Sequence, residues 1–270
     1  MDHIATGNKY YESGHYEKAI AEYSQAIKLD PTDALAYFLR GITYQLLEQY
    51  DKAISDFTEA IHLDPTDPSA FNIRGLTYRL LGHYDKAIAD FTEAMKCDPT
   101  DASACLKRGE SYDLITQYDK AIADFTEAME RDPTGALAYT KRGEVYAYLE
   151  HYEKAFADYT KAITIDPEEA ETYTLRGDAY DTLKQYDLAI ADYTQALQLD
   201  PTDASAYTIR GRAYYDFKQY DKAIADYTQA IKLDPTDALA YKNRGMVFTA
   251  LRQPAKAEAD RKRAKEVGME

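Results

Sequence analysis

Apolar and aromatic residues recur along this chain with the spacing of an α-helix. In residues 34–67 they form two stripes whose members lie three, four or seven residues apart, Tyr37, Gly41 and Tyr44 in one and Ala53, Phe57, Ala60 and Ile61 in the other. These steps are typical of the buried face of an amphipathic helix, because a strand would alternate every second residue. The segment is therefore predicted to contain two helices.

The same pattern returns every 34 residues. Glycine lies at positions 7, 41, 75, 109, 143, 177, 211 and 245, and proline at 31, 65, 99, 133, 167, 201 and 235. A fixed period of this size is typical of a repeat array. We divide residues 1–270 into eight units that we expect to form one solenoid, 1–33, 34–67, 68–101, 102–135, 136–169, 170–203, 204–237 and 238–270. Each unit is numbered so that its glycine is position 8.

Proline and aspartate mark the ends of the predicted helices. Pro65 ends the second helix of its unit, because proline cannot continue the helical hydrogen bonds and disfavours helix in the residue before it. Asp67 then suits the N-cap of the next helix. Gly135 and Glu169 take this place in two later units, so those helix starts are expected to be weaker. The break within each unit is short, which predicts antiparallel neighbouring helices.

Small residues at fixed positions predict close contact between helices. Position 8 is glycine and positions 20 and 27 are alanine in every unit. Glycine inside a helix costs about 0.5–1 kcal/mol relative to alanine, so a close approach must compensate. We expect the glycine to face the alanine at position 20, as Gly143 would face Ala155. The alanine at position 27 would let the next unit stack, while aromatic residues at positions 11 and 24 fill the space beside them.

Seven of these positions carry a family resemblance. Tyr at 4, Gly at 8, Tyr at 11, Ala at 20, Tyr or Phe at 24, Ala at 27 and Pro at 32 resemble the tetratricopeptide repeat, with minor departures at His3 and Cys105. The resemblance implies an all-α fold, a right-handed superhelical solenoid of antiparallel helix hairpins whose first helices line a concave groove. It also implies a non-catalytic protein that binds peptides or protein surfaces in that groove.

The eighth unit departs from the pattern. Pro254 replaces the tyrosine at position 17, Arg261 the aromatic residue at position 24 and Lys265 the apolar residue at position 28. A helix with one stacking face and one polar face is what the end of a repeat array requires. We interpret it as a polar C-terminal capping helix.

Composition and charge narrow the function. The formal charge is -15, and such a field repels polyanions, so we expect no nucleic-acid partner. No apolar run is long enough to span a membrane, and no signal peptide begins the chain, so a cytoplasmic protein without membrane contact is expected. Only two cysteines occur, which fits a reducing compartment. The eight units together take up residues 1–270, so we expect neither a separate catalytic domain nor a cofactor.

No residue type with metal or nucleophile chemistry recurs at a suitable spacing. His15, His83 and His151 all fall at position 16, two units apart, which is too far for shared coordination of a metal that needs ligands at about 2 Å. Cys97 and Cys105 replace a leucine and a tyrosine of other units, so they are interpreted as small buried apolar residues. No metal site is predicted.

Two charged positions change together. Position 7 is arginine and position 23 aspartate from the second unit onward, whereas the first unit has Thr6 and Glu22. We interpret them as a structural ladder of ion pairs between paired helices, with a binding role as the alternative. A partly exposed pair would contribute only about 0–1 kcal/mol.

The binding site is predicted on the first helix of each unit. The resemblance places positions 2, 5, 6, 9, 12 and 13 on the concave groove, where this chain varies most between units. The predicted groove residues are Leu35, Phe38, Leu39, Ile42, Asn72, Ile73, Leu76, Arg79, Lys107, Glu110, Asp113, Lys141, Glu144, Asp178, Asp181, Arg212, Tyr215 and Lys242.

An apolar section followed by an acidic one predicts the kind of partner. We expect a basic, amphipathic protein or peptide segment, although some of the apolar residues could instead pack between neighbouring helices. Two further functions stay open. One is a self-assembling structural element that associates end to end, and the other is an accessory subunit that presents a substrate to a separate enzyme.

Overall fold

The computed structural model describes residues 2–268 and contains helices only within that range. It divides into two larger compact units, unit 1 (Met1–Pro133) and unit 2 (Thr134–Glu270). The 34-residue segments defined from the sequence are called repeats from here on. Residue 1, which begins the predicted first repeat, and residues 269 and 270, which end the last, lie outside the described range. The all-α fold predicted from the helical spacing is confirmed, whereas the single continuous solenoid stays a prediction.

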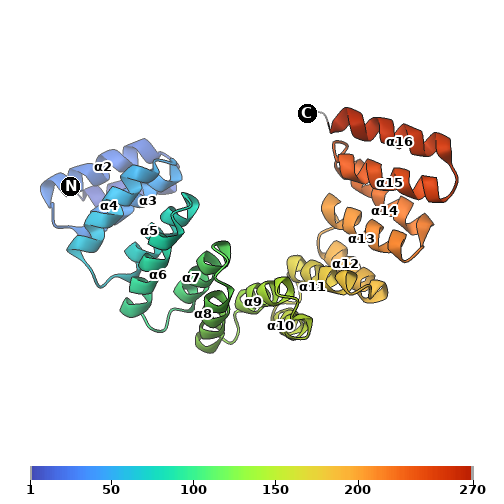
Figure 1. Cartoon of the computed structure of the whole chain (residues 1–270). Helices are drawn as coiled ribbons and strands as arrows, with labels where there is room; N and C mark the ends of the chain where they lie inside the picture. Colours follow the sequence, from blue (N-terminus) through green and yellow to red (C-terminus); the bar gives the residue numbers. More distant parts are fainter. Residues whose placement is uncertain (1, 269–270) are drawn as a thin grey trace. The chain divides into compact units, whose positions relative to one another are not determined.

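Each repeat forms one hairpin of two helices, called here the A and B helices (Figure 1). Unit 1 contains α1 (His3–Glu12), α2 (Tyr16–Leu29), α3 (Ala34–Leu46), α4 (Tyr50–Leu63), α5 (Pro68–Leu80), α6 (Tyr84–Cys97), α7 (Ala102–Leu114) and α8 (Tyr118–Arg131). Unit 2 contains α9 (Ala136–Tyr148), α10 (Tyr152–Ile165), α11 (Ala170–Thr182), α12 (Tyr186–Leu199), α13 (Ala204–Asp216), α14 (Tyr220–Leu233), α15 (Ala238–Ala250) and α16 (Pro254–Val267). Odd-numbered helices are the A helices and even-numbered helices the B helices.

Aspartate is the N-cap residue of most A helices, as the sequence predicted. Asp33 accepts hydrogen bonds from the backbone N–H groups of Leu35 and Ala36, at 3.0 and 3.3 Å. Glu169 makes a weaker version, accepting from the N–H of Glu171 at 3.3 Å. Gly135 offers no side-chain cap.

The turn between the A and B helices contains a feature that the sequence did not reveal. Position 15 adopts a left-handed backbone in every repeat, and only Gly14 and Gly82 are glycines there. The other six are larger residues with φ between 54° and 61°, Glu48, Thr116, Glu150, Lys184, Lys218 and Arg252. Such a backbone is uncommon for residues other than glycine. The hairpin therefore requires this conformation even where glycine is absent.

The glycine at position 8 of each repeat does not contact the alanine at position 20 in the way that the sequence predicted. A methyl group added to Gly143 would lie 2.7 Å from Cε1 of Tyr159, so the glycine faces the ring at position 24 and not the alanine at position 20. The same contact with a ring recurs from Gly7 to Gly211. Only at Gly245 is the nearest atom the backbone oxygen of the alanine at position 20, Ala257, because Arg261 replaces the ring.

The alanine at position 20 instead helps to receive the next repeat. In unit 2, Ala155 and Tyr159 of α10 pack in one cluster with Ala179, which is position 10 of α11. The same cluster recurs one repeat later, where Ala189 and Tyr193 contact Ala213. Repeats therefore stack by placing a small residue at position 10 against the alanine and ring of the repeat before it.

The predicted ladder of arginine and aspartate is confirmed. Arg176 donates two hydrogen bonds to Asp192, from Nε to Oδ2 and from Nη2 to Oδ1, both at 2.8 Å. Its third nitrogen, Nη1, donates to Oγ1 of Thr160 in the repeat before, at 3.1 Å. The pair is more buried than the sequence suggested, since the Asp192 side chain is only 9% exposed and that of Arg176 17%. The ladder therefore joins successive repeats as well as paired helices.

The first repeat replaces this pair with another. Thr6 and Glu22 do not form it, and Nδ1 of His3 lies 2.7 Å from Oε2 of Glu22. The hydroxyl of Thr6 bonds the backbone oxygen of Asp2. A link between α1 and α2 is thus kept although both ladder residues have changed.

Candidate functional site

The predicted groove residues all lie on A helices. They occupy α3, α5 and α7 in unit 1 and α9, α11, α13 and α15 in unit 2. We call the surface formed by positions 2, 5, 6, 9, 12 and 13 of these helices the A-helix face. Adjacent A helices contact one another, α3 with α5 and α5 with α7 in unit 1, and α9 with α11 and α13 with α15 in unit 2. Between α11 and α13 a hydrogen bond joins Arg212 to Asp181, so each unit presents a row of neighbouring A helices.

The apolar section lies in unit 1. Leu35 is 53% exposed, and Leu39, Ile42, Ile73 and Leu76 are half-buried. Leucines at position 13 extend this section, since Leu46 and Leu80 are largely exposed. These side chains leave apolar surface that a ligand could cover.

Two predicted members of the apolar section serve the packing of the repeats. The ring of Phe38 lies 6.0 Å from that of Phe57, centroid to centroid, in the B helix of the same repeat. Asn72 is buried, and its Nδ2 donates to Oδ2 of Asp101 at 3.3 Å, which joins α5 to the cap of α7. The alternative that some groove residues pack between helices therefore applies to these two.

Charges on the A-helix face of unit 1 are largely paired. Arg79 of α5 bonds Glu110 of α7. Burial lowers the pKa of Lys107 beside them. Because a cation and a carboxylate neutralise each other here, Glu110 contributes less to an acidic surface than the sequence suggested.

Unit 2 carries a surplus of carboxylates. Nζ of Lys141 lies 2.6 Å from Oε1 of Glu144 and 3.8 Å from Oε1 of Glu171. On the next helices, Arg212 donates from Nη2 to Oδ2 of Asp181 at 2.7 Å. The remaining acids of α11 and α13 are Asp178 and Asp216.

Asp178, Asp181, Arg212 and Asp216 form an acidic cluster. Asp178 accepts a hydrogen bond from the Tyr193 hydroxyl at 2.7 Å. Burial raises the pKa of Asp178, while Tyr193 and Arg212 act against that rise. Burial and the neighbouring Asp181 also raise the pKa of Asp216. Oδ1 of Asp181 is buried and has no hydrogen-bond partner among residues 2–268. One cation is shared by three carboxylates, so the cluster can accept a further positive charge.

Other predicted residues lie at the edge of the A-helix face. The ring of Tyr215 contacts that of Tyr220 in α14 at 5.7 Å between centroids. Lys242 borders a hollow with residues of α16. The face also exposes apolar side chains that were not predicted, Leu137, Leu239 and Met246. They occupy positions 2 and 9, which belong to the six positions predicted to line the groove. Listing those six positions for every repeat would therefore have included them.

The histidine, cysteine and carboxylate side chains decide whether residues 2–268 contain a metal site or a reactive cysteine. Residues 2–268 contain no cluster of histidine, cysteine, aspartate or glutamate that could hold a metal ion. His15, His83 and His151 are exposed at the start of B helices, as predicted. Cys105 is buried, and burial raises the pKa of its thiol to about 11, which keeps it protonated. No helix in this range is long and apolar enough to cross a membrane.

The hairpins and their ladder define an α-helical repeat protein, and comparison with family models identifies which one. Models described as tetratricopeptide repeat match residues 34–67, 68–101, 136–169 and 170–203, residues 192–225, and residues 102–134. A model described as TPR repeat matches residues 7–48 and 211–251. The chain therefore belongs to the tetratricopeptide repeat (TPR) family. Comparison with curated proteins gives no match.

Solved structures of TPR proteins share the fold. The C-terminal part of a TPR repeat-containing protein from Cytophaga hutchinsonii is 20% identical, with a TM-score of 0.71 over 89% of this chain and 98% of that chain. A TPR protein from Parabacteroides merdae is 19% identical, with a TM-score of 0.67 over 91% and 97% of the two chains. MamA is 25% identical, with a TM-score of 0.57 over 60% and 94%. Family and neighbours support a scaffold for protein–protein interaction.

Proposed function

We propose that this protein is a non-catalytic scaffold that binds a peptide or protein segment on its A-helix face. The observation that carries the proposal is the division of exposed side chains on that face. Leu35 and its neighbours leave apolar surface uncovered in unit 1, and the acidic cluster leaves excess negative charge in unit 2. Membership of the TPR family supports a protein ligand.

The chemistry of the two sections specifies the ligand. A surface of one sign attracts the opposite charge, so the acidic cluster would bind lysine or arginine side chains. The apolar section would bind leucine or phenylalanine, each contributing about 1.5–3 kcal/mol when fully buried. The proposed ligand is therefore basic and amphipathic. Each section can be tested by itself.

The test of the acidic cluster uses labelled peptides with lysine and arginine at one end and leucine and phenylalanine at the other. Asp216→Asn is the informative variant, because Asp216 is exposed and the structure shows no hydrogen bond or ion pair for it among residues 2–268. Fluorescence anisotropy should show weaker binding than for the unaltered protein, and weaker binding of both at high salt, since exposed charges are screened beyond about 8–10 Å. Asp221→Asn on α14 removes the same charge outside the A-helix face and should bind normally.

The apolar section has its own test. Leu35→Ser should weaken binding of the same peptides and leave the helical circular dichroism unchanged. Leu29→Ser is the matched control, because Leu29 is 73% exposed on the B helix α2. Binding of the basic peptides that ignores salt and is unchanged in both the Asp216→Asn and the Leu35→Ser variants would contradict the proposal.

A further inference from the structure

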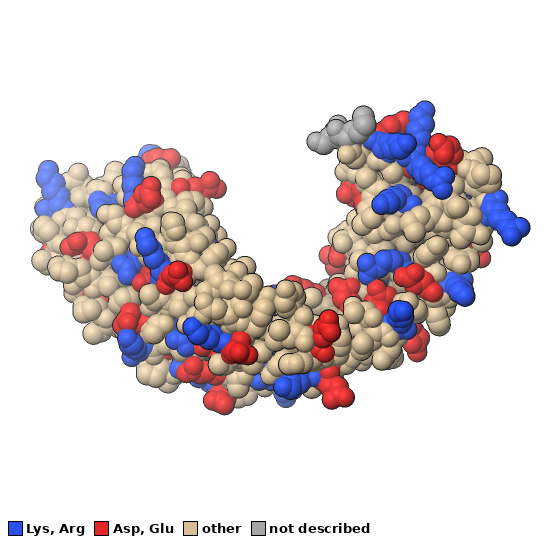
Figure 2. Space-filling model, viewed as in Figure 1, with Lys and Arg blue, Asp and Glu red and all other residues tan. Residues whose placement is uncertain are grey.

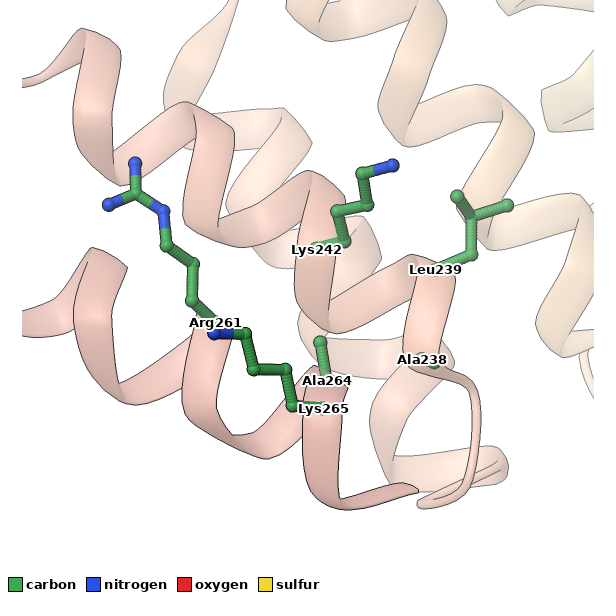
Figure 3. A pocket seen from close by; sticks show the side chains of 6 residues that line it. All are labelled: Ala238, Leu239, Lys242, Arg261, Ala264 and Lys265. Carbon is green, nitrogen blue, oxygen red and sulfur yellow. The ribbon is translucent and has the colours of Figure 1, made fainter. Parts of the chain in front are cut away.

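A hollow of about 480 Å³ lies at the end of unit 2, between α15 and α16. We call it the terminal seat. Figure 3 shows the side chains that line it, from α15 Ala238, Leu239 and Lys242, and from α16 Arg261, Ala264 and Lys265. In repeat numbering these are positions 1, 2, 5, 24, 27 and 28.

The same positions receive a helix in earlier repeats. Position 24 of α12 is Tyr193, which packs against Ala213 of the following A helix. Position 5 of α13 is Thr208, whose hydroxyl bonds Oδ2 of Asp237, the cap of the following A helix, at 3.2 Å. The shape of the terminal seat is therefore that of a surface on which an α-helix packs.

The charge of the terminal seat differs from that of the same positions in earlier repeats. Lys242, Arg261 and Lys265 stand where other repeats have uncharged residues at positions 5, 24 and 28. Within residues 2–268, no carboxylate forms an ion pair with Lys242 or Lys265. The only carboxylate near Arg261 in that range is Glu258, at 3.8 Å, and Nη2 of Arg261 donates to Oγ1 of Thr249 at 3.0 Å. Basic side chains gather over α15 and α16 in Figure 2. Three cations around an apolar floor favour a ligand that offers both carboxylates and apolar side chains.

We propose that the terminal seat binds an acidic, amphipathic α-helix of a partner protein. The packing of the earlier repeats gives the register of that helix. Its N-cap would lie near Lys242, as Asp237 lies near Thr208. The tenth residue after the cap would lie near Arg261, as Ala213, ten residues after Asp203, lies against Tyr193. An acidic residue at each of these two places would pair with the seat, and small apolar residues between them would cover Ala264.

A peptide based on this chain provides the probe. A synthetic copy of residues 169–183 carries glutamate at its N-cap, and Ala179→Glu in that copy adds an acid ten residues later. Because isolated helices of this length are marginal in water, the peptide is cross-linked across two solvent-facing positions. Fluorescence anisotropy with the full chain should show binding that weakens as salt increases. The copy with Ala179→Lys should not bind.

Two variants of α16 separate the terminal seat from general charge. Arg261→Glu should weaken binding of the acidic peptide by about tenfold or more, equivalent to about 1.4 kcal/mol. Lys262→Glu makes the same charge change on the same helix, outside the seat, and should have little effect. Absence of binding by the unaltered chain, undiminished binding by the Arg261 variant, or an equal loss in both variants would overturn the proposal. Arg261 and Lys262 lie outside the A-helix face, so these results are independent of the proposed function.

Discussion

At the scale of single residues, a glycine facing a ring fixes how closely the two helices of a repeat approach. A methyl group at Gly143 would lie 2.7 and 2.9 Å from two atoms of the buried Tyr159 ring, whereas at Gly245 its nearest neighbours would be at 3.4 Å. The first distance requires the helices to move apart, and the second is an ordinary contact. The same substitution should therefore have opposite effects in two repeats of unit 2.

Gly143→Ala should lower the free energy of unfolding by about 1–2 kcal/mol, because overpacking outweighs the better helix propensity of alanine. Gly245→Ala should raise it by about 0.5–1 kcal/mol, since propensity acts there without a clash. Urea unfolding followed by circular dichroism measures both. Equal effects of the two substitutions would refute the contact with the ring.

The ladder provides a second residue-scale prediction. Asp192→Asn leaves the partly buried guanidinium of Arg176 without its charged partner. We expect a loss of about 2–3 kcal/mol, below the upper range for a broken buried pair because Arg176 stays partly exposed. Asp187→Asn, exposed in the first turn of the same helix, should cost less than about 1 kcal/mol. A similar small cost for both would mean that the ladder is not a structural element.

Asp178 should make stability depend on pH. Burial raises the pKa of this carboxyl above its usual value of 3.8. A group whose folded-state pKa is raised stabilises the fold when protonated, and this contribution is lost as pH rises through the folded-state pKa. Asp178→Asn should therefore raise the melting temperature at neutral pH and change it little at pH values below the usual pKa.

The first repeat contains the arrangement that this variant would create. There Asn8 accepts the hydrogen bond from Tyr23 at 2.7 Å, as Asp178 does from Tyr193. The asparagine variant therefore keeps the hydrogen bond and removes only the charge. Thermal unfolding of the variant and the unaltered protein at several pH values tests the prediction. An equal shift in melting temperature at every pH would contradict the role given to ionisation of Asp178.

At the scale of helices, the caps determine how firmly each A helix begins. Gly135 precedes α9 with φ -80° and ψ 95°, a conformation open to any residue, but it has no capping side chain. Gly135→Asp should stabilise unit 2 by about 0.5–1 kcal/mol, because it adds a cap and reduces the freedom of the unfolded chain. Asp203→Gly, which removes an existing cap, should have the opposite sign. Urea unfolding tests the pair of variants.

At the scale of the whole molecule, the first and last repeats bear on self-association. Position 10 is small and buried in the other repeats but is the exposed Lys9 in the first, and position 24 is Arg261 in the last. Stacking of one copy on another through these positions would bring two cations together in a contact that is otherwise apolar. We expect the chain to sediment as a monomer at micromolar concentrations.

Restoring the repeat pattern should reverse this behaviour. The double variant Lys9→Val with Arg261→Tyr recreates the small residue and the ring that join repeats elsewhere, as Val247 and Tyr227 do. Analytical ultracentrifugation should then show association that grows with concentration. Concentration-dependent association of the unaltered chain would instead support the self-assembling alternative.

The sequence by itself determined the helices, their pairing and the ladder, because the 34-residue period repeats the local signals along the whole chain. Helical spacing, capping aspartates and the residue before each proline act locally, so they could be read without coordinates. The interpretation of the last helix as a polar cap rests on the same kind of signal, polar residues at positions that are apolar in other repeats, and it stays a prediction.

Only the tertiary structure decided which residues meet across helices. Spacing could not show that Gly143 faces Tyr159 and not Ala155, because both lie on the same side of α10. Nor could it show that Arg79 neutralises Glu110 or that Arg212 neutralises Asp181, since each pair joins two different repeats. The free charge of a surface depends on such pairing, which distances between helices set and the order of residues does not. The identity of the acids left over, Asp178 and Asp216, thus emerged only from the packed repeats.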